Sequence, residues 1–150
     1  MLRRLLLPAV SVTLAATLAA PANPQGALPS PRAVVYKSPT CGCCKKWEEH
    51  LRRNGFEVES HDLADVSPMK RELGVPKPLA SCHTAVVGSY VIEGHVPAAD
   101  ILRLLREKPP VVGLTAPGMP PSAPGMDTGR EPYDVLTFDA RGRTTVWARH

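Results

Sequence analysis

The stretch that decides the fold is RAVVYKSPTCGCCKKWEEHLRR, residues 32–53. Its first six residues favour extended backbone, which predicts a short buried strand over 32–37. Beyond the cysteines, Trp47 and Leu51 are spaced four positions apart among charged residues, which is typical of a helix face. The stretch therefore predicts a strand and a helix from Cys44, with a cysteine-rich turn between them.

The sequence that follows predicts further alternation of strands and helices. TAVV and YVIEG flank Gly88-Ser89, a signal for a tight hairpin. The expected elements are a strand over 32–37, a helix from Cys44, a strand over 56–60, a helix capped by Ser67, strands over 84–87 and 90–94, and a helix opened by Pro97. This β-α-β-α-β-β-α order predicts an α/β, thioredoxin-like fold with one parallel and one antiparallel strand pair.

Residues 109–132 differ in character from the rest of the chain. They read PPVVGLTAPGMPPSAPGMDTGREP, are rich in Pro and Gly, and contain APGM twice. Such a composition is typical of a linker. However, YDVLTF and TTVWAR follow on either side of DARGR and predict a β-hairpin over 133–148. We therefore expect a loop tethered at both ends, within a single domain over 32–150.

The N-terminus has the layout of a secretory signal peptide. Two arginines precede an apolar run that ends at Ala20, and a small-x-small cleavage pattern follows. The run is shorter than the roughly 20 apolar residues of a membrane span. We expect a signal peptide over 1–22, a short linker over 23–31, and export to the periplasm without membrane attachment after cleavage.

The distribution of charge along the sequence argues against nucleic acid as a partner. The net charge is +4, and the basic residues are interleaved with acidic ones. Proteins that bind nucleic acid usually show a clustered basic face. Binding to nucleic acid is therefore not expected.

Three cysteines lie at the start of the first predicted helix. Cys41 and Cys44 are spaced as C-x-x-C, where the helix dipole favours the thiolate form. This spacing suits a redox couple and a metal site equally well. Cys43 adds a third sulfur, which invites wrong pairing in a disulfide exchanger. Because neighbouring side chains on a helix diverge by about 100°, all three can reach one ion only if 41–43 is loop.

The fourth cysteine is followed by a histidine. Cys82-His83 directly precedes the predicted strand over 84–87. In thioredoxins a cis-proline followed by threonine stands at the corresponding place, whereas here His83 is followed by Thr84. A cysteine and an imidazole in place of the proline that guides peptide substrates favour a metal site over thiol exchange.

Several sequence blocks resemble one known family. They are CGCCKKW, GVPKPLASCHTAVV, YVIEGHVPAADILRLL and GLTAPGMPPSAPGMD with EPYDVLTFD, and they run from about residue 33 to 140. These blocks are similar to a family of small exported metal-binding proteins that includes CopG, long catalogued as a domain of unknown function and associated with copper resistance. The resemblance implies a thioredoxin-like fold that binds copper through cysteines. It leaves open a multinuclear thiolate cluster and interconversion of Cu(I) and Cu(II). The ligands carried over by position are Cys41, Cys43, Cys44 and Cys82.

Other residues are candidates for additional ligands. Thiolate and thioether donors together select Cu(I), whereas zinc rarely uses methionine, so zinc is the less expected metal. Met119 and Met126 can close over the thiolates or pin the loop to the core. His83 is a further candidate ligand. His95 is expected to be a hydrogen-bonded structural residue, or a residue that contacts the metal ligands without necessarily binding the metal itself.

The sequence therefore favours an exported copper-binding protein of copper resistance or homeostasis. Its expected partners are copper ions and other exported copper-handling proteins. A thiol–disulfide oxidoreductase is the first alternative, and a disulfide-stabilised binding module or a zinc site is the second. A metal-binding protein is favoured over an enzyme, and a copper-dependent oxidoreductase remains open.

Overall fold

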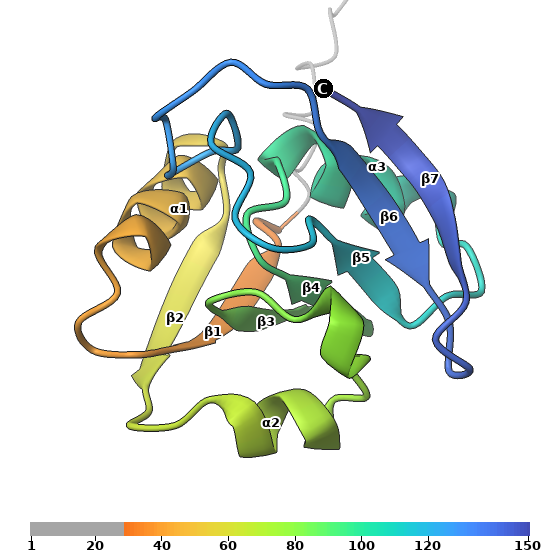
Figure 1. Cartoon of the computed structure of the whole chain (residues 1–150), viewed down its shortest axis with the longest axis horizontal. Helices are drawn as coiled ribbons and strands as arrows, with labels where there is room; N and C mark the ends of the chain where they lie inside the picture. Colours follow the sequence, from red (N-terminus) through yellow and green to blue (C-terminus); the bar gives the residue numbers. More distant parts are fainter. Residues whose placement is uncertain (1–28) are drawn as a thin grey trace, which may run out of the picture.

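The computed structural model describes residues 29–150. The predicted signal peptide and most of the predicted linker lie outside the described residues and stay predictions. The described part forms a seven-stranded sheet with three α-helices, which confirms the predicted α/β class (Figure 1). None of the helices within 29–150 has both the length and the apolar character needed to cross a membrane.

The sheet has the strand order β2-β1-β3-β4-β5-β6-β7. Its strands are β1 (Arg32–Lys37), β2 (Glu57–Asp62), β3 (Thr84–Val87), β4 (Tyr90–Glu93), β5 (Gly113–Thr115), β6 (Asp134–Phe138) and β7 (Thr144–Arg149). The helices are α1 (Gly42–Arg53), α2 (Ser67–Glu72) and α3 (Ala98–Glu107), with a 3₁₀ turn η1 at Lys77–Leu79. The predicted C-terminal hairpin is formed by β6 and β7.

Strand directions follow from the connections. The crossover through α1 makes β1 and β2 parallel, while β3 runs antiparallel to both β1 and β4. The β3–β4 turn contains Gly88, whose φ of +61° is the left-handed conformation that glycine adopts readily. The predicted parallel pair and antiparallel hairpin are therefore both confirmed.

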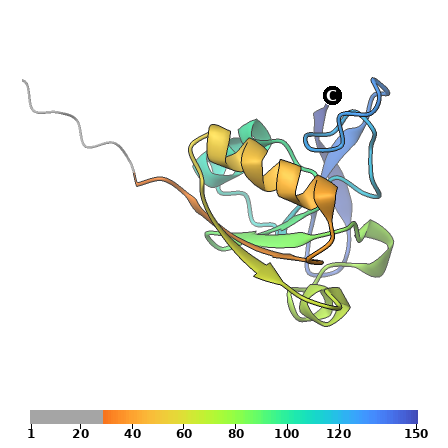
Figure 2. The same ribbon diagram turned by 90° about the vertical axis from the view of Figure 1, so that its left-hand side faces the viewer.

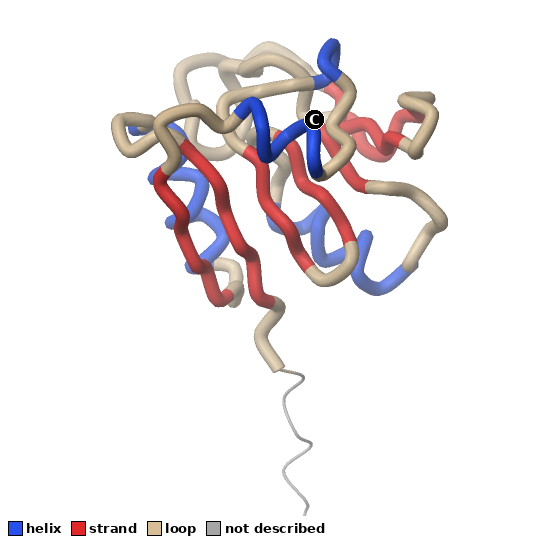
Figure 3. The backbone as a smooth tube through the Cα atoms, turned by 90° about the horizontal axis from the view of Figure 1, so that it is seen from below, coloured by secondary structure: helices blue, strands red, loops and turns tan. Residues whose placement is uncertain are grey.

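Helices cover both faces of the sheet. In Figure 2, α1 and α3 lie on one face and α2 on the other, and Figure 3 shows α2 in front of the strands. Trp47 and Leu51 of α1 pack in the main core with Ile101 and Leu104 of α3 and the buried residues of β1. A smaller apolar cluster contains Val75, Val91 and Phe138. The main core thus fixes α1, which contains Cys43 and Cys44 and is preceded by Cys41, against the sheet.

The structure corrects several predicted boundaries. Residues 109–132 are not loop throughout, because β5 pairs with β4 and β6 and its Leu114 is fully buried. The chain passes very close to β4 there, since a Cβ on Gly113 would lie 1.7 Å from the Val91 carbonyl oxygen. The second strand is 57–62 instead of 56–60, and the N-cap of α2 is Val66 instead of Ser67.

Residues 116–129, here called the strap, cross the molecule beside α1 (Figure 1). A Cβ on Gly125 would lie 2.7 Å from the Trp47 backbone nitrogen and 2.9 Å from the Cys43 carbonyl oxygen. The φ of Gly125 is +86°. Only glycine permits both this close approach and this backbone conformation without strain. The strap is therefore held tightly against the N-terminal half of α1.

Candidate metal centre

Cys41, Cys43 and Cys44 occupy the N-terminal end of α1. Cys41 is the N-cap, with φ −74° and ψ 96°, and its carbonyl accepts a hydrogen bond from the Lys45 backbone nitrogen. The Sγ atoms of Cys41 and Cys43 are 3.5 Å apart. The predicted start of this helix at Cys44 was wrong, because α1 begins at Gly42. Loop over 41–43, the condition set from the sequence for all three sulfurs to reach one ion, is therefore not met. The sulfurs come together because the N-cap residue lies outside the helical path, so its side chain does not diverge as on a regular helix.

In the structure Cys41 and Cys44 form a disulfide, with their Cα atoms 5.3 Å apart. The chain has four cysteines, all in the described part, and Cys43 and Cys82 are the two free thiols. Two of the four predicted ligands therefore cannot bind a metal ion until this disulfide is reduced. The C-x-x-C spacing was interpreted from the sequence as suiting a redox couple of Cys41 and Cys44 and a metal site equally well, and the structure holds this pair in its oxidised form.

Cys82 lies in the turn between η1 and β3 and completes the sulfur group. Its Sγ is 3.6 Å from the Sγ of Cys44, although the two residues are 38 positions apart. The four sulfurs all lie within 4.8 Å of one another. Burial, followed by the charge of Cys43, raises the pKa of Cys82 to about 11. Cys82 is thus a neutral thiol near neutral pH, and a metal ion would displace its proton.

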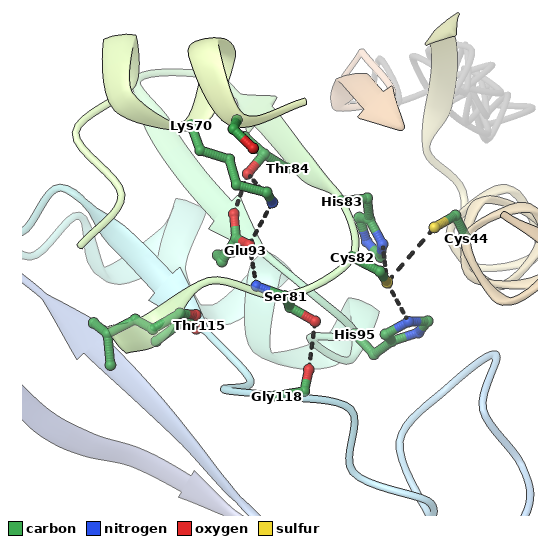
Figure 4. Close-up of polar contacts among 12 residues, drawn as sticks. Cys44, Lys70, Ser81, Cys82, His83, Thr84, Glu93, His95, Thr115 and Gly118 are labelled. Carbon is green, nitrogen blue, oxygen red and sulfur yellow. Dashed lines mark hydrogen bonds and ion pairs between the residues drawn. The ribbon is translucent and has the colours of Figure 1, made fainter. Parts of the chain in front are cut away.

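Two buried imidazoles stand next to Cys82 (Figure 4). The Sγ of Cys82 is 3.3 Å from His83 Nδ1 and 3.1 Å from His95 Nε2. The His83 ring packs against Trp47 at a tilt of 41°, with 4.3 Å between the ring centroids, and its Nε2 is buried without a hydrogen-bond partner. Burial lowers the pKa of His83 well below its ordinary value and also lowers the pKa of His95. Both rings are therefore neutral, which is the form that binds metals.

The strap orients His95. Nδ1 of His95 is 2.8 Å from the Pro124 carbonyl oxygen, which can only accept a hydrogen bond. Nδ1 therefore carries the ring proton and donates it, and Nε2 presents its lone pair to Cys82. A histidine that binds a metal is commonly held in this way by a backbone carbonyl.

The two strap methionines are placed differently. Met119 is 53% exposed, so it is not a hydrophobic pin in the core. Met126 is half-buried and follows Gly125, which lies against the backbone of Cys43. Their assignment as ligands stays a prediction.

A buried ion pair anchors the turn that carries Cys82 (Figure 4). Glu93 is fully buried, and its Oε1 accepts hydrogen bonds from Lys70 Nζ at 2.6 Å and from the Ser81 backbone nitrogen at 2.5 Å. The other carboxylate oxygen accepts a bond from the Thr84 hydroxyl. The carboxylate thus holds the residues on both sides of Cys82-His83. Sequence reasoning missed this pair, although an acidic residue ending an apolar strand was a signal for it.

The fold and the site define a small α/β protein with a cysteine-rich candidate metal centre. Residues 79–126 match a family described as a protein of unknown function, DUF411. Two solved structures named copper resistance protein CopG, form 2 and form 1, are each 45% identical to this chain with a TM-score of 0.76. The alignments cover 81% and 82% of this chain and 98% of each CopG chain. No curated protein matches the sequence.

This chain belongs to the CopG-like family. Membership and the sulfur group together support a copper-related role. The resemblance drawn from the sequence blocks is thereby confirmed.

Proposed function

We propose that this protein is an exported copper-binding protein of copper resistance, which holds Cu(I) through the thiolates of Cys41, Cys43, Cys44 and Cys82. The observation that carries the proposal is the convergence of four sulfurs from two distant segments within 4.8 Å of one another. Soft thiolate ligands favour Cu(I), together with Zn(II) and iron–sulfur clusters, over harder metal ions. The name of the CopG structures points to the same metal.

The proposed Cu(I) site requires that the Cys41–Cys44 disulfide be reduced. The Cys41–Cys44 disulfide takes up two electrons and two protons to give two thiols, and together with Cys43 and Cys82 these complete the donor set. Each thiol then loses its proton as it binds the metal. Copper loading is accordingly coupled to the thiol redox state of the surroundings.

A thioredoxin-like fold is part of the proposal. It is supported by the strand order β2-β1-β3-β4, in which β3 is antiparallel to its neighbours, and by a C-x-x-C pair at the N-terminus of α1. The proposal also includes export to the periplasm, directed by the predicted signal peptide at 1–22. Other exported copper-handling proteins are the expected partners, and we assign no catalytic residue.

The test is an anaerobic titration of the fully reduced protein with Cu(I) in competition with a chromophoric Cu(I) chelator. The reduced wild type is expected to take copper from the chelator. The matched control is the same protein with the Cys41–Cys44 disulfide intact, which should bind Cu(I) at least about tenfold more weakly because two donors are missing. Equal, weak binding by both forms would refute the Cu(I) site.

The disulfide at the N-terminus of α1 favours thiol–disulfide exchange as the second candidate. In that case Cys43→Ser would leave disulfide reductase activity intact, while Cys41→Ser would abolish it. Under the copper proposal, Cys43→Ser weakens Cu(I) binding instead. Measuring both properties on these two variants separates the candidates.

A further inference from the structure

We propose that the cavity between α2 and the 3₁₀ turn η1 is a binding site for a small organic anion, that is, a molecule with a carboxylate or phosphate group on a short apolar body. The cavity lies beside α2, on the face of the sheet opposite α1 (Figure 2). None of the cysteines and neither of the imidazoles beside Cys82 lines it. The anion site is therefore separate from the candidate metal centre and does not depend on the Cu(I) proposal.

The first argument is the size and the lining of the cavity. Its volume is about 420 Å³, within the range of roughly 300–1,000 Å³ that is typical of pockets for small molecules. The residues that line it are Ser67, Lys70, Arg71, Val75, Lys77 and Ala80. Val75 and Ala80 supply apolar surface, to which the long cationic side chains add their methylene groups. The cavity therefore offers apolar contact to the body of a ligand and positive charge to one end of it.

The second argument is the charge of the lining, which contains three cations and no carboxylate. Within residues 29–150, neither Arg71 nor Lys77 has a carboxylate at ion-pair distance, and both side chains are exposed. A cleft lined by charges of one sign attracts ions of the other sign. A guanidinium can donate two parallel hydrogen bonds to a carboxylate or phosphate, and an ammonium adds a point charge. The lining therefore favours an anion of this chemistry.

The third argument concerns the ammonium group of Lys70, a residue that is only 8% exposed. Its Nζ donates to the Thr84 hydroxyl at 3.1 Å and to Glu93 Oε1 at 2.6 Å (Figure 4). An ammonium has three N–H groups, so one remains without an acceptor among the side chains and backbone of residues 29–150. A buried donor without a partner is costly. Because Lys70 also lines the cavity, an anion bound there is a suitable acceptor for this donor.

The fourth argument is that the backbone holds the walls of the cavity in place. Gly74 follows the end of α2 with a φ of +74°, a conformation that glycine adopts readily. Beyond this turn, the Val75 backbone nitrogen donates to the Lys70 carbonyl at 2.9 Å. On the opposite wall, the Ala80 backbone nitrogen donates to the Lys77 carbonyl at 3.3 Å. The site is thus formed before a ligand arrives, so binding does not have to order the chain.

The test titrates the disulfide-bonded protein with benzoate, with phenyl phosphate and with benzamide as a neutral analogue, and follows the backbone amides by two-dimensional NMR. The anions are expected to shift the amide signals of Val75 and Ala80, with dissociation constants in about the millimolar range. The anion that binds more tightly identifies the preferred charged group. Arg71→Gln and Lys77→Gln should each weaken binding at least about fivefold. Arg106→Gln removes an exposed cation from α3 instead, so this matched control should bind like the wild type.

Three results would overturn the proposal. The first is that neither anion shifts the amide signals of Val75 and Ala80 at about 10 mM. The second is that benzamide binds as tightly as benzoate, since the cationic lining would then contribute nothing. The third is that Arg106→Gln weakens binding as much as Arg71→Gln and Lys77→Gln do, because this would show only a general attraction to positive charge. The Cu(I) titration involves other residues, so failure of either proposal leaves the other standing.

Discussion

The two sides of the candidate metal centre are built in different ways. The α1 side offers three sulfurs from four consecutive positions, and two of them are joined as a disulfide. The hairpin side offers one sulfur and two buried imidazoles, held by the Lys70–Glu93 pair and by the strap. A local turn is enough to gather the first set, whereas the second requires four segments of the chain. The α1 side is therefore the redox-sensitive one, and the hairpin side is the rigid one.

The largest expected effect comes from breaking the anchor of the hairpin side. Lys70→Met leaves the fully buried Glu93 carboxylate without its cation, which should lower the free energy of unfolding by about 3–5 kcal/mol. Urea denaturation of the oxidised protein measures this. Alkylation of Cys82 should also become faster, because the Ser81–Thr84 turn loses its anchor.

Two variants serve as controls for this prediction. Lys70→Met combined with Glu93→Leu removes both charges and should recover most of the lost stability. Arg53→Met breaks an exposed pair with Glu49 and should change stability little. A loss in Lys70→Met no larger than in Arg53→Met would show that the buried pair does not anchor the turn.

A smaller effect is expected where the strap joins the two sides. Gly125→Ala combines a φ of +86° with a clash against the backbone of Cys43 and Trp47, and it should cost about 2–4 kcal/mol. Gly118→Ala has φ +69° but open space around the added methyl, so only the conformational cost of about 1–2 kcal/mol remains. Chemical denaturation compares the two variants. Equal losses of unfolding free energy in the two variants would mean that the close packing of the strap on α1 contributes nothing to stability.

The smallest effect is a pH dependence at Cys82, where the two sides meet. The pKa of this thiol is raised in the folded protein to about 11, so the native state holds the proton more tightly than the unfolded chain. The resulting stability is fully present below the ordinary thiol pKa of 9.0 and is lost as the pH rises toward 11. The melting temperature of the oxidised protein should therefore fall over this range. In Cys82→Ser, this part of the fall should be absent.

The elements around the site were predictable to different degrees. Residues that favour extended backbone identified the strand before the cysteines, hydrophobic spacing identified the helix after them, and the Gly88-Ser89 turn signal identified the hairpin. Hydrophobic patterning had limits elsewhere. It failed at Gly113–Thr115, because three residues are too few to show a period and the flanking prolines suggested loop. It also failed at Glu93, since a pattern of polar and apolar residues does not reveal which buried charges are paired.

The sequence by itself determined the α/β class, the sulfur-rich turn before a helix and the pairing of Cys82 with His83 in one short segment. These features depend on neighbours along the chain, where residue spacing and local conformation carry the information. Only the tertiary structure decided that Cys82 meets Cys44 and that His95 turns its free nitrogen toward Cys82. The tertiary structure also decided that the buried carboxylate of Glu93 holds the turn that carries Cys82. Such contacts depend on strand order and on the close approach of distant backbones, which no local pattern encodes.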